Sequence, residues 1–402
     1  MEKEDIKKNI IIFTPYYDPE PFPINTFVQD LSKNSIINNV KVITALPNYR
    51  KYSFYDGYSF FGPFTKNEKK ISITRLLIIP RYSNSSISIL LFYISFFLSS
   101  FFFFIYFALR NRNKYDHILT FCGSPIYVGF IGIFASKLMN IKSSQWIQDI
   151  WPEAIQTTKG LKNKYIINII NFFQIKMWKY SDIIFSESYS LTKYLKSNFP
   201  DKKIKTLYNP VREKEISNSN ENFYKDDKLM FSYTGNIGGA QNLEKILEAF
   251  SDLNSSNFEL HMCGDGPLLN DLKKKFNQKN IFWHGWLTGR ELDKVYKQSD
   301  FFILSLNSKG RQSLILPSKL QTYFQLKKPI FCVASGAVKE LIDYTKSGIT
   351  TEYDDKKNII ELFNKAMKLT NSERAEMAVN GFKFYKKNFK SETIIKEFIN
   401  FI

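Results

Sequence analysis

A long apolar run in the first third of the chain is the feature that most constrains how it can fold. No charged residue occurs from Ser83 to Leu109, and 19 of the 23 residues from Ile87 to Leu109 are apolar, the other four being serines. By length and composition such a run can cross a bilayer as a helix. However, the strand-like segments ISITRLLIIP and HILTFCGSP flank it, which indicates the crossover of a β-α-β unit. A crossover returns to the same sheet, which a single membrane span would prevent.

We expect this run to form a half-buried helix that lies on a bilayer surface. Its exposed side would present Phe97, Phe101 and Phe104 to the lipid, and Arg110 and Arg112 would lie at the level of the head groups. A fully buried crossover helix and a true membrane span are the alternatives. A half-buried helix on the bilayer surface would make this a cytoplasmic protein that is peripheral, or monotopic, at the cytoplasmic membrane.

Composition and cysteine usage indicate a cytoplasmic protein of two domains. The chain has 402 residues, of which 44% are hydrophobic and 23% charged, and a single core rarely serves so long a chain. Its three cysteines show no metal-binding or CxxC spacing, which suits the reducing cytosol. The N-terminal segment MEKEDIKKN lacks the apolar core of a signal peptide.

The chain carries a formal net charge of +18. Such a charge fits nucleic acid, anionic lipid head groups or phosphorylated small molecules as partners, and codon usage that favours lysine is an alternative source of it. Binding of nucleic acid needs basic residues interleaved with exposed aromatic residues. Here the aromatic residues are concentrated in the uncharged run, so no nucleic-acid partner is expected.

The order of strand-like and helical segments predicts an α/β fold with two Rossmann-like domains that face each other across a cleft. The polar stretch from Glu213 to Asp227 indicates a linker, which makes residues 1–212 and 213–384 the two domains. Residues 385–402 are expected to form a terminal helix that can cross back to the first domain. The expected strands lie within residues 9–17, 40–47, 71–79, 117–125, 143–150, 182–188, 203–210, 229–236, 258–266, 280–287, 300–306 and 328–335.

A glycine-rich turn follows the first strand of the second series. Gly235, Asn236, Gly238 and Gly239 lie between that strand and an amphipathic helix. Such a turn presents free backbone N–H groups and the positive end of the helix dipole, which suits a diphosphate. A tight turn that simply needs glycine is the alternative. The segment CGDGP, at the end of the next strand, fits either explanation.

The segment PSKLQTY places a lysine at the start of a helix. Pro317 suits a helix start, so Ser318 and Lys319 lie in the first turn. A lysine there opposes the helix dipole, which favours an anionic ligand such as a diphosphate. A solvated lysine is the alternative. The residues that follow in this helix are Gln321, Thr322 and Tyr323.

Two carboxylates end a strand of the first domain. Asp149 and Glu153 flank Trp151 in QDIWPE, where they suit recognition of sugar hydroxyls, with the indole available for ring stacking. A helix N-terminus capped by Asp149 is the alternative, and both can hold. The three histidines lie in or beside apolar runs without a ligand spacing, and no aspartate-X-aspartate motif occurs, so neither a metal centre nor histidine catalysis is expected.

Eight segments, taken in this order, carry a resemblance that covers nearly the whole chain. They are PYYDPEPFPINTFVQDL, TALPNYRKYSFYDGYSFF, CGSPIYVG, WIQDIWPEAI, YTGNIGGAQNLEKILEA, CGDGPL, LPSKLQTYFQLKKPI and NGFKFYKKNF. The chain resembles family 4 glycosyltransferases of the GT-B fold, and within them the WbuB-like group that builds bacterial O-antigen and capsule.

The resemblance implies a retaining, metal-independent hexosyl or hexosaminyl transferase without a further cofactor. Its donor would be a nucleotide sugar held by the C-terminal half, and the group favours a UDP-linked N-acetylated hexosamine or 6-deoxyhexosamine such as N-acetyl-L-fucosamine. Its acceptor would be an undecaprenyl-diphosphate-linked saccharide at the inner leaflet of the cytoplasmic membrane.

The matching motifs imply a set of site residues. Lys319, Asp149 and Glu153 would be catalytic, because Lys319 would stabilise the leaving diphosphate while the carboxylates orient hydroxyl groups. Asn25 and Trp151 would contact the acceptor. The donor would contact Gly235, Asn236, Gly238, Gln241, Ser318, Gln321, Thr322 and Tyr323.

Three departures from the family pattern keep alternatives open. Leu314 and Thr322 stand where wider family 4 enzymes carry paired glutamates, Gln148 stands where many relatives have a catalytic histidine, and NPVR replaces NWAE. One alternative is a nucleotide-sugar 2-epimerase of the same fold, which would need titratable groups that the sequence scarcely offers. The other is a catalytically inactive scaffold of a polysaccharide assembly complex, which the missing glutamates would suit.

Overall fold

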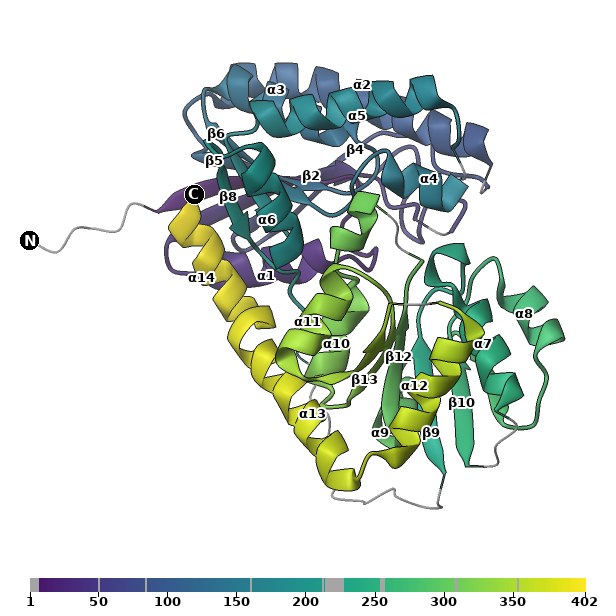
Figure 1. The fold of residues 1–402 in the computed structure, drawn as a ribbon. Coiled ribbons are helices and arrows are strands. Elements are labelled where there is room, and N and C mark those ends of the chain that lie inside the picture. Colours follow the sequence, from purple (N-terminus) through teal and green to yellow (C-terminus); the bar gives the residue numbers. More distant parts are fainter. Residues whose placement is uncertain are drawn as a thin grey trace, which may run out of the picture. The chain divides into compact units, whose positions relative to one another are not determined.

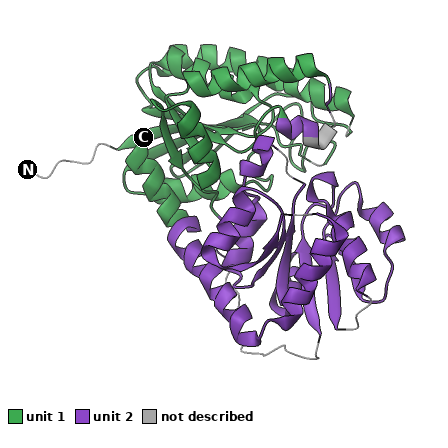
Figure 2. Ribbon diagram, viewed as in Figure 1, with its two compact units in different colours: residues 1–152, 163–210, 391–402 green, residues 153–162, 211–390 purple. Residues whose placement is uncertain are grey.

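The computed structural model describes residues 7–49, 51–83, 85–159, 161–211, 213, 228–253, 257–307, 310–352 and 354–402. They form two compact units (Figure 2). The first comprises residues 1–152, 163–210 and 391–402, and the second comprises residues 153–162 and 211–390. These ranges differ from the predicted domains chiefly in residues 153–162, which belong to the second unit. Most of the predicted linker, residues 214–227, lies outside the described residues.

The first unit is built on an eight-stranded sheet in the order β3-β4-β2-β1-β5-β6-β7-β8. All neighbours run parallel except β3 and β4. The antiparallel β3 was not predicted, because its sequence TKNE is polar and exposed throughout. The strands are β1 Lys8–Phe13, β2 Ile37–Ala45, β3 Thr65–Glu68, β4 Ile71–Leu76, β5 His117–Cys122, β6 Lys142–Ile147, β7 Ile183–Ser186 and β8 Lys203–Thr206.

Helices cover both faces of this sheet (Figure 1). Helices α1 (Pro23–Lys33) and α14 (Ser391–Phe401) share one core with it, in which the Phe27 and Phe398 rings meet edge to face at 5.2 Å. Helices α2 (Ser86–Asn111), α3 (Tyr127–Met139) and α5 (Lys164–Tyr180) lie on the other face (Figure 1). The shorter α6, Tyr189–Asn198, connects β7 to β8.

The apolar run forms α2, which connects β4 to β5 and therefore occupies the predicted crossover position. Phe92, Phe96, Phe104 and Phe107 pack into the core, and Phe104 meets Phe13 edge to face at 5.1 Å. Phe104 is fully buried, so the prediction that it contacts a membrane is wrong. In length and composition α2 is nevertheless sufficient to cross a membrane.

The second unit has a six-stranded parallel sheet in the order β11-β10-β9-β12-β13-β14. The strand order reverses between β9 and β12, and sheets of this kind bind ligands beside such a reversal, at the carboxyl ends of the strands. The short β14 was not predicted. The strands are β9 Leu229–Thr234, β10 Phe258–Cys263, β11 Ile281–Gly285, β12 Phe301–Ser305, β13 Ile330–Val333 and β14 Gly348–Thr351.

The second unit also contains helical segments. They are α4 Glu153–Lys159, η1 Gly239–Gln241, α7 Leu243–Asp252, α8 Leu269–Lys275, α9 Gly289–Gln298, η2 Gly310–Leu314, α10 Ser318–Gln325, α11 Ala337–Thr345, α12 Lys356–Lys368, α13 Asn371–Phe384 and η3 Tyr385–Phe389.

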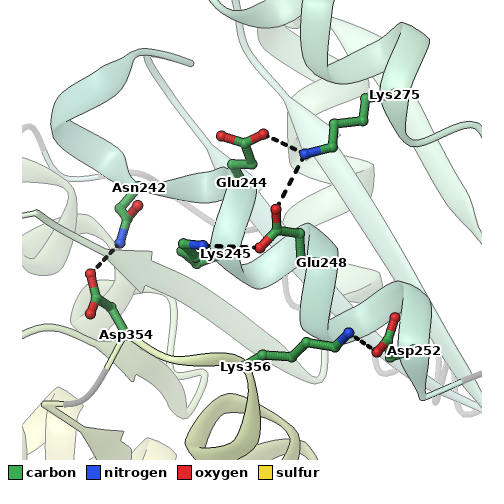
Figure 3. Close-up of polar contacts among 8 residues, drawn as sticks. All are labelled: Asn242, Glu244, Lys245, Glu248, Asp252, Lys275, Asp354 and Lys356. Carbon is green, nitrogen blue, oxygen red and sulfur yellow. Dashed lines mark hydrogen bonds and ion pairs between the residues drawn. The ribbon is translucent and has the colours of Figure 1, made fainter.

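Helix α7 separates a core face from a charged face. Its apolar residues pack into the core of the second unit. On the opposite side Lys275 contacts Glu244 at 2.7 Å and Glu248 at 3.2 Å, and Lys356 contacts Asp252 (Figure 3). Exposed pairs of this kind contribute little to stability. These acidic residues are therefore solvated surface groups and not candidates for a site.

Candidate functional site

The turn after β9 is held against the turn after β10. The Gly235 N–H donates to the Cys263 carbonyl at 2.8 Å, and the Ile237 N–H donates to the Asp265 carbonyl at 2.8 Å. Gly264 has a φ of +153°, and a Cβ there would lie 1.7 Å from the Gly235 carbonyl oxygen. Two neighbouring strands thus end in two turns that only glycine allows to approach so closely.

Lys319 of α10 reaches this turn. Its Nζ lies 3.2 Å from the place that a Cβ of Gly235 would occupy. The same atom donates to the Tyr233 hydroxyl at 2.8 Å and stands 4.0 Å from the centroid of the Tyr233 ring. The two segments that the sequence singled out for a diphosphate therefore meet within the second unit.

The surroundings of Lys319 favour an anion. In the part of the chain that the structure describes, no carboxylate lies within 4.0 Å of its Nζ, and burial lowers its pKa to about 7. Helix α10 begins without a side-chain cap, because Pro317 has none to offer. A partly buried ammonium group without a counter-ion is costly, and a diphosphate would relieve that cost.

Two other predicted donor residues brace the turn. The Asn236 Nδ2 donates to the Gln241 Oε1 at 3.1 Å. A Cβ at Gly238 would lie 2.8 Å from that Nδ2, so glycine is needed for this contact. The two amides hydrogen-bond to each other across the turn and so help to fix its shape.

Two residues of PSKLQTY are buried in the core of the second unit, where they hydrogen-bond to the protein backbone. Gln321 and Tyr323 are fully buried, so the prediction that their side chains contact the donor is wrong. With its amide nitrogen facing the acceptors, Gln321 donates to the carbonyls of Ser318 at 2.6 Å and Pro317 at 3.0 Å. The Tyr323 hydroxyl accepts from the Thr234 N–H at 3.2 Å, which ties α10 to the end of β9. Ser318 itself is exposed and Thr322 is half-buried.

Glu153 is held by an arginine that the sequence did not single out. Arg311 Nε donates to Glu153 Oε1 at 2.5 Å, and Arg311 Nη2 donates to Glu153 Oε2 at 3.0 Å. Both side chains are more than four-fifths buried, at 18% and 17% exposed. Glu153 belongs to α4 and Arg311 to η2, both in the second unit. The carboxylate predicted to orient hydroxyl groups is thus engaged by a two-pronged ion pair.

Asp149 and Trp151 lie in the first unit. Asp149 Oδ2 accepts a hydrogen bond from Ser124 Oγ at 3.1 Å, and burial raises the pKa of the Asp149 carboxyl. Trp151 is only 8% exposed, and its backbone N–H donates to Gln174 Oε1 at 3.2 Å. The prediction that its indole stacks on a sugar ring is wrong, since the ring is packed inside the unit.

A buried glutamate organises the loops beside Asn25. Glu20 Oε1 accepts from the backbone N–H groups of Asn48 at 2.8 Å and Tyr49 at 2.7 Å, and Glu20 Oε2 accepts from that of Tyr17 at 3.2 Å. Burial raises the pKa of Glu20 to about 7. Asn25 Nδ2 donates to the Glu20 carbonyl at 2.6 Å, and its buried Oδ1 has no hydrogen-bond partner among the described residues. Glu20 lies in a quoted motif, yet only the structure shows its role.

One departure from the family pattern, Gln148, contacts a residue that the pattern keeps. Asn209, the first residue of NPVR, donates from Nδ2 to Gln148 Oε1 at 2.7 Å and to Glu187 Oε2 at 2.9 Å. Arg212, the last residue of NPVR, lies outside the described residues. Over the ranges that the structure describes, no group of three His, Cys, Asp or Glu side chains is placed to hold a metal ion.

The sequence of residues 213–384 matches the family model described as glycosyl transferases group 1. The matched residues make up most of the second unit, which is therefore similar to a group 1 glycosyltransferase domain. The turn at Gly235 and the side chain of Lys319 lie inside the matched range, so the candidate anion-binding site lies in this domain. A 41.2 kDa protein of the cps region of Klebsiella pneumoniae is 24% identical over 264 residues, which cover 63% of this chain and 69% of that protein.

Solved glycosyltransferases share the fold of both units. The crystal structure of HepE from Anabaena in complex with UDP has a TM-score of 0.65 at 10% identity and covers 98% of both chains. The crystal structure of WaaG, described as a glycosyltransferase involved in lipopolysaccharide biosynthesis, has a TM-score of 0.63 at 12% identity and covers 96% of this chain and 98% of that one. The predicted GT-B fold is confirmed.

Proposed function

We propose that this chain is a retaining glycosyltransferase of the WbuB-like group. Its donor would be a UDP-linked N-acetylated hexosamine or 6-deoxyhexosamine, such as N-acetyl-L-fucosamine. Its acceptor would be an undecaprenyl-diphosphate-linked saccharide. The transfer would be one step in the synthesis of O-antigen or capsule. The relative from a cps region and the likeness to WaaG support this setting, and HepE in complex with UDP supports a uridine nucleotide.

The observation that carries the proposal is Lys319 at the glycine turn. Its ammonium group is partly buried, has no carboxylate partner among the described residues, and lies beside Gly235 and the uncapped start of α10. This arrangement supplies a positive charge and N–H donors at one point. Those are the groups that a diphosphate needs both when it binds and when it leaves.

The proposed chemistry needs no strong protein base and no metal ion. As the bond between sugar and diphosphate breaks, negative charge grows on the phosphate oxygens, and Lys319 would stabilise it. In a reaction on a single face of the sugar, the departing phosphate can accept the proton of the attacking hydroxyl group. Asp149, which accepts from Ser124, would orient hydroxyl groups.

Product analysis tests the proposal directly. Detergent-solubilised protein would be incubated with a panel of UDP-sugars and lipid-linked acceptors, and the products read by mass spectrometry. We expect an acceptor that gains one sugar mass together with release of UDP. Conversion of the donor without an acceptor would instead indicate an epimerase. UDP binding without any turnover across the panel would indicate an inactive scaffold.

The affinity for UDP should depend on pH through Lys319. Because burial lowers the pKa of Lys319 to about 7 and a bound diphosphate raises it, binding above pH 7 takes up a proton. Affinity should therefore be level below pH 7 and fall by up to about tenfold per pH unit above it. The terminal phosphate of UDP loses its last proton at about pH 6, so it does not cause this decline. Isothermal titration calorimetry from pH 6 to 9 measures the profile.

Lys319→Arg is the matched control for this profile, because arginine stays charged over the whole range. We expect the arginine variant to show a nearly flat profile. If the wild-type protein were equally flat above pH 7, Lys319 would not be the group that senses the diphosphate.

We further propose that two helices of the first unit hold the protein at the membrane surface. Outside its core side α2 exposes Phe102 and Leu109, and α5 exposes Ile169 and Phe172, each more than half accessible. Both helices lie on the same face of the sheet (Figure 1). Basic residues accompany them, since the exposed Arg110 and Arg112 end α2 and Lys176 stands over the Phe172 ring at 5.3 Å. Apolar side chains flanked by lysine and arginine suit an anionic bilayer.

Glutamates on these helices should release the protein from vesicles. Phe102→Glu combined with Phe172→Glu removes two apolar side chains worth about 1.5–3 kcal/mol each when buried, so we expect binding to fall at least about tenfold. Flotation with vesicles that contain anionic lipid measures it. Tyr344→Glu with Met367→Glu, two exposed positions in the second unit, is the control. Undiminished flotation of the first pair would contradict the proposed membrane face.

A further inference from the structure

Arg81 precedes α2 in the sequence, but its guanidinium group turns toward the carboxyl edge of the first sheet. Its Nη2 donates to the Tyr16 hydroxyl. The group stands over the rings of Phe92 at 4.9 Å and Tyr93 at 5.6 Å. Tyr16 follows β1, so aromatic rings hold the arginine where a ligand of this sheet would bind.

The charge of Arg81 has no ionic partner in the described part of the chain. No carboxylate lies within 4.0 Å of its guanidinium nitrogens, and its buried Nε has no hydrogen-bond partner. Glu20, whose charge it influences, is already satisfied by three backbone N–H groups. A cation held in a fixed, partly buried position without a counter-ion is a site that an anion would complete.

This position coincides with the strand-order reversal of the first sheet. Strands β1 and β5 are neighbours there, and Ser124 follows β5 as Tyr16 follows β1. Three groups lie close enough to Tyr93 to change the pKa of its hydroxyl group: Arg81 and Ser124 lower this pKa, and Asp149 raises it. Asp149 accepts from Ser124 and is not an ion-pair partner of Arg81. The cluster is therefore rich in donors, and the two carboxylates at its border, Glu20 and Asp149, accept hydrogen bonds from other groups.

The apolar face of α2 begins immediately beside this cluster. Ile87 and Leu90, in the first turns of α2, are 66% and 55% exposed. A ligand with an anionic head and a long apolar chain would match the two features together. A guanidinium group also suits phosphate oxygens better than an ammonium group does, because its planar fork binds two of them at once.

We propose that Arg81, with the hydroxyl groups of Tyr16 and Tyr93, binds the diphosphate of the prenyl-diphosphate-linked acceptor. This inference rests on the proposed transfer to a lipid-linked saccharide, and it names the group by which the first unit holds that substrate. Arg81 is a positioning residue in this role, because it fixes the acceptor and does not touch the bond that breaks.

Binding of farnesyl diphosphate to the detergent-solubilised full chain tests the inference, with farnesol and inorganic pyrophosphate as parallel probes. We expect farnesyl diphosphate to bind more tightly than either. Arg81→Gln should weaken its binding at least about tenfold, as loss of a two-pronged charged contact would, while UDP affinity stays unchanged. Arg81→Lys keeps the charge without the fork and should fall in between. Arg290→Gln, which removes an exposed positive charge from α9 of the second unit, should bind as the wild type does.

Three results would overturn the inference. They are wild-type binding of farnesyl diphosphate by Arg81→Gln, equal binding of farnesol, and equal binding of pyrophosphate, which would make the ligand a free diphosphate. A thermal unfolding transition unchanged from that of the wild type shows that a variant is folded, because Arg81 lies in the first unit and the proposed UDP site in the second. If the wild type bound no UDP and transferred no sugar, the proposed function would fail instead, whatever farnesyl diphosphate did.

Discussion

Replacing Lys319 with alanine is expected to lower turnover at least about tenfold and to weaken UDP binding, while the fold stays intact. The substitution removes the ammonium group that lies 3.2 Å from the Cβ position of Gly235, where charge would develop on the leaving diphosphate. Because the native ammonium group is partly buried and has no carboxylate partner among the described residues, its loss should not destabilise the unliganded protein. Initial rates with a lipid-linked acceptor and calorimetric UDP titration measure the two effects.

A matched control separates this effect from the effect of removing any one positive charge from the second unit. Lys273 is exposed on α8 of the same unit, so Lys273→Ala removes one positive charge away from the turn. It should leave turnover and UDP binding unchanged. Near-normal turnover of Lys319→Ala would remove Lys319 from the mechanism.

Replacing Gly264 with alanine is expected to disrupt the same site through the backbone. The new Cβ would lie 1.7 Å from the Gly235 carbonyl oxygen, at a φ of +153° that side chains rarely adopt. The two turns must then separate, which breaks the 2.8 Å bond from the Gly235 N–H to the Cys263 carbonyl. We expect a loss of about 3 kcal/mol or more in unfolding free energy, together with loss of UDP binding. Thermal unfolding and UDP titration of the full chain measure both.

Gly239→Ala is the control for backbone effects in this region. Gly239 lies at the start of η1, and a Cβ there would meet nothing within 4 Å. The change should stay within about 0.5 kcal/mol. Wild-type stability of Gly264→Ala would show that the two turns are not packed as described.

Most strands could be predicted because their signal is local. β-branched and apolar runs such as those of β1 and β12 are buried on both faces of a parallel sheet, so the pattern is continuous and strong. The exceptions carry no such signal. β3 is TKNE and fully exposed, and β14 is the four-residue GITT. Each is recognisable only once its neighbour in the sheet offers it hydrogen bonds.

The site was predicted in part, for the same physical reason. Glycine at 235 and 238, directly after a strand, is a local signal for a special turn. A lysine in the first turn of a helix is a second local signal. Gly235 and Lys319 could therefore be predicted from their neighbours in the sequence. Arg311 did not, because its partner Glu153 is 158 residues away and nothing beside Arg311 shows that pairing. Glu20 and Arg81 were likewise hidden, since a buried charge is defined by what surrounds it in space.

The sequence by itself determined that residues 87–109 form a crossover helix and that Lys319 begins another, because helix period, strand pattern and capping are properties of neighbours in the chain. Only the tertiary structure decided that Phe104 packs on Phe13 while Phe102 stays exposed, that Glu153 pairs with Arg311, and that Lys319 meets Gly235. Those outcomes depend on which surfaces meet when the sheets close. Contacts between distant segments are set by packing and burial, for which a linear sequence carries no local signal.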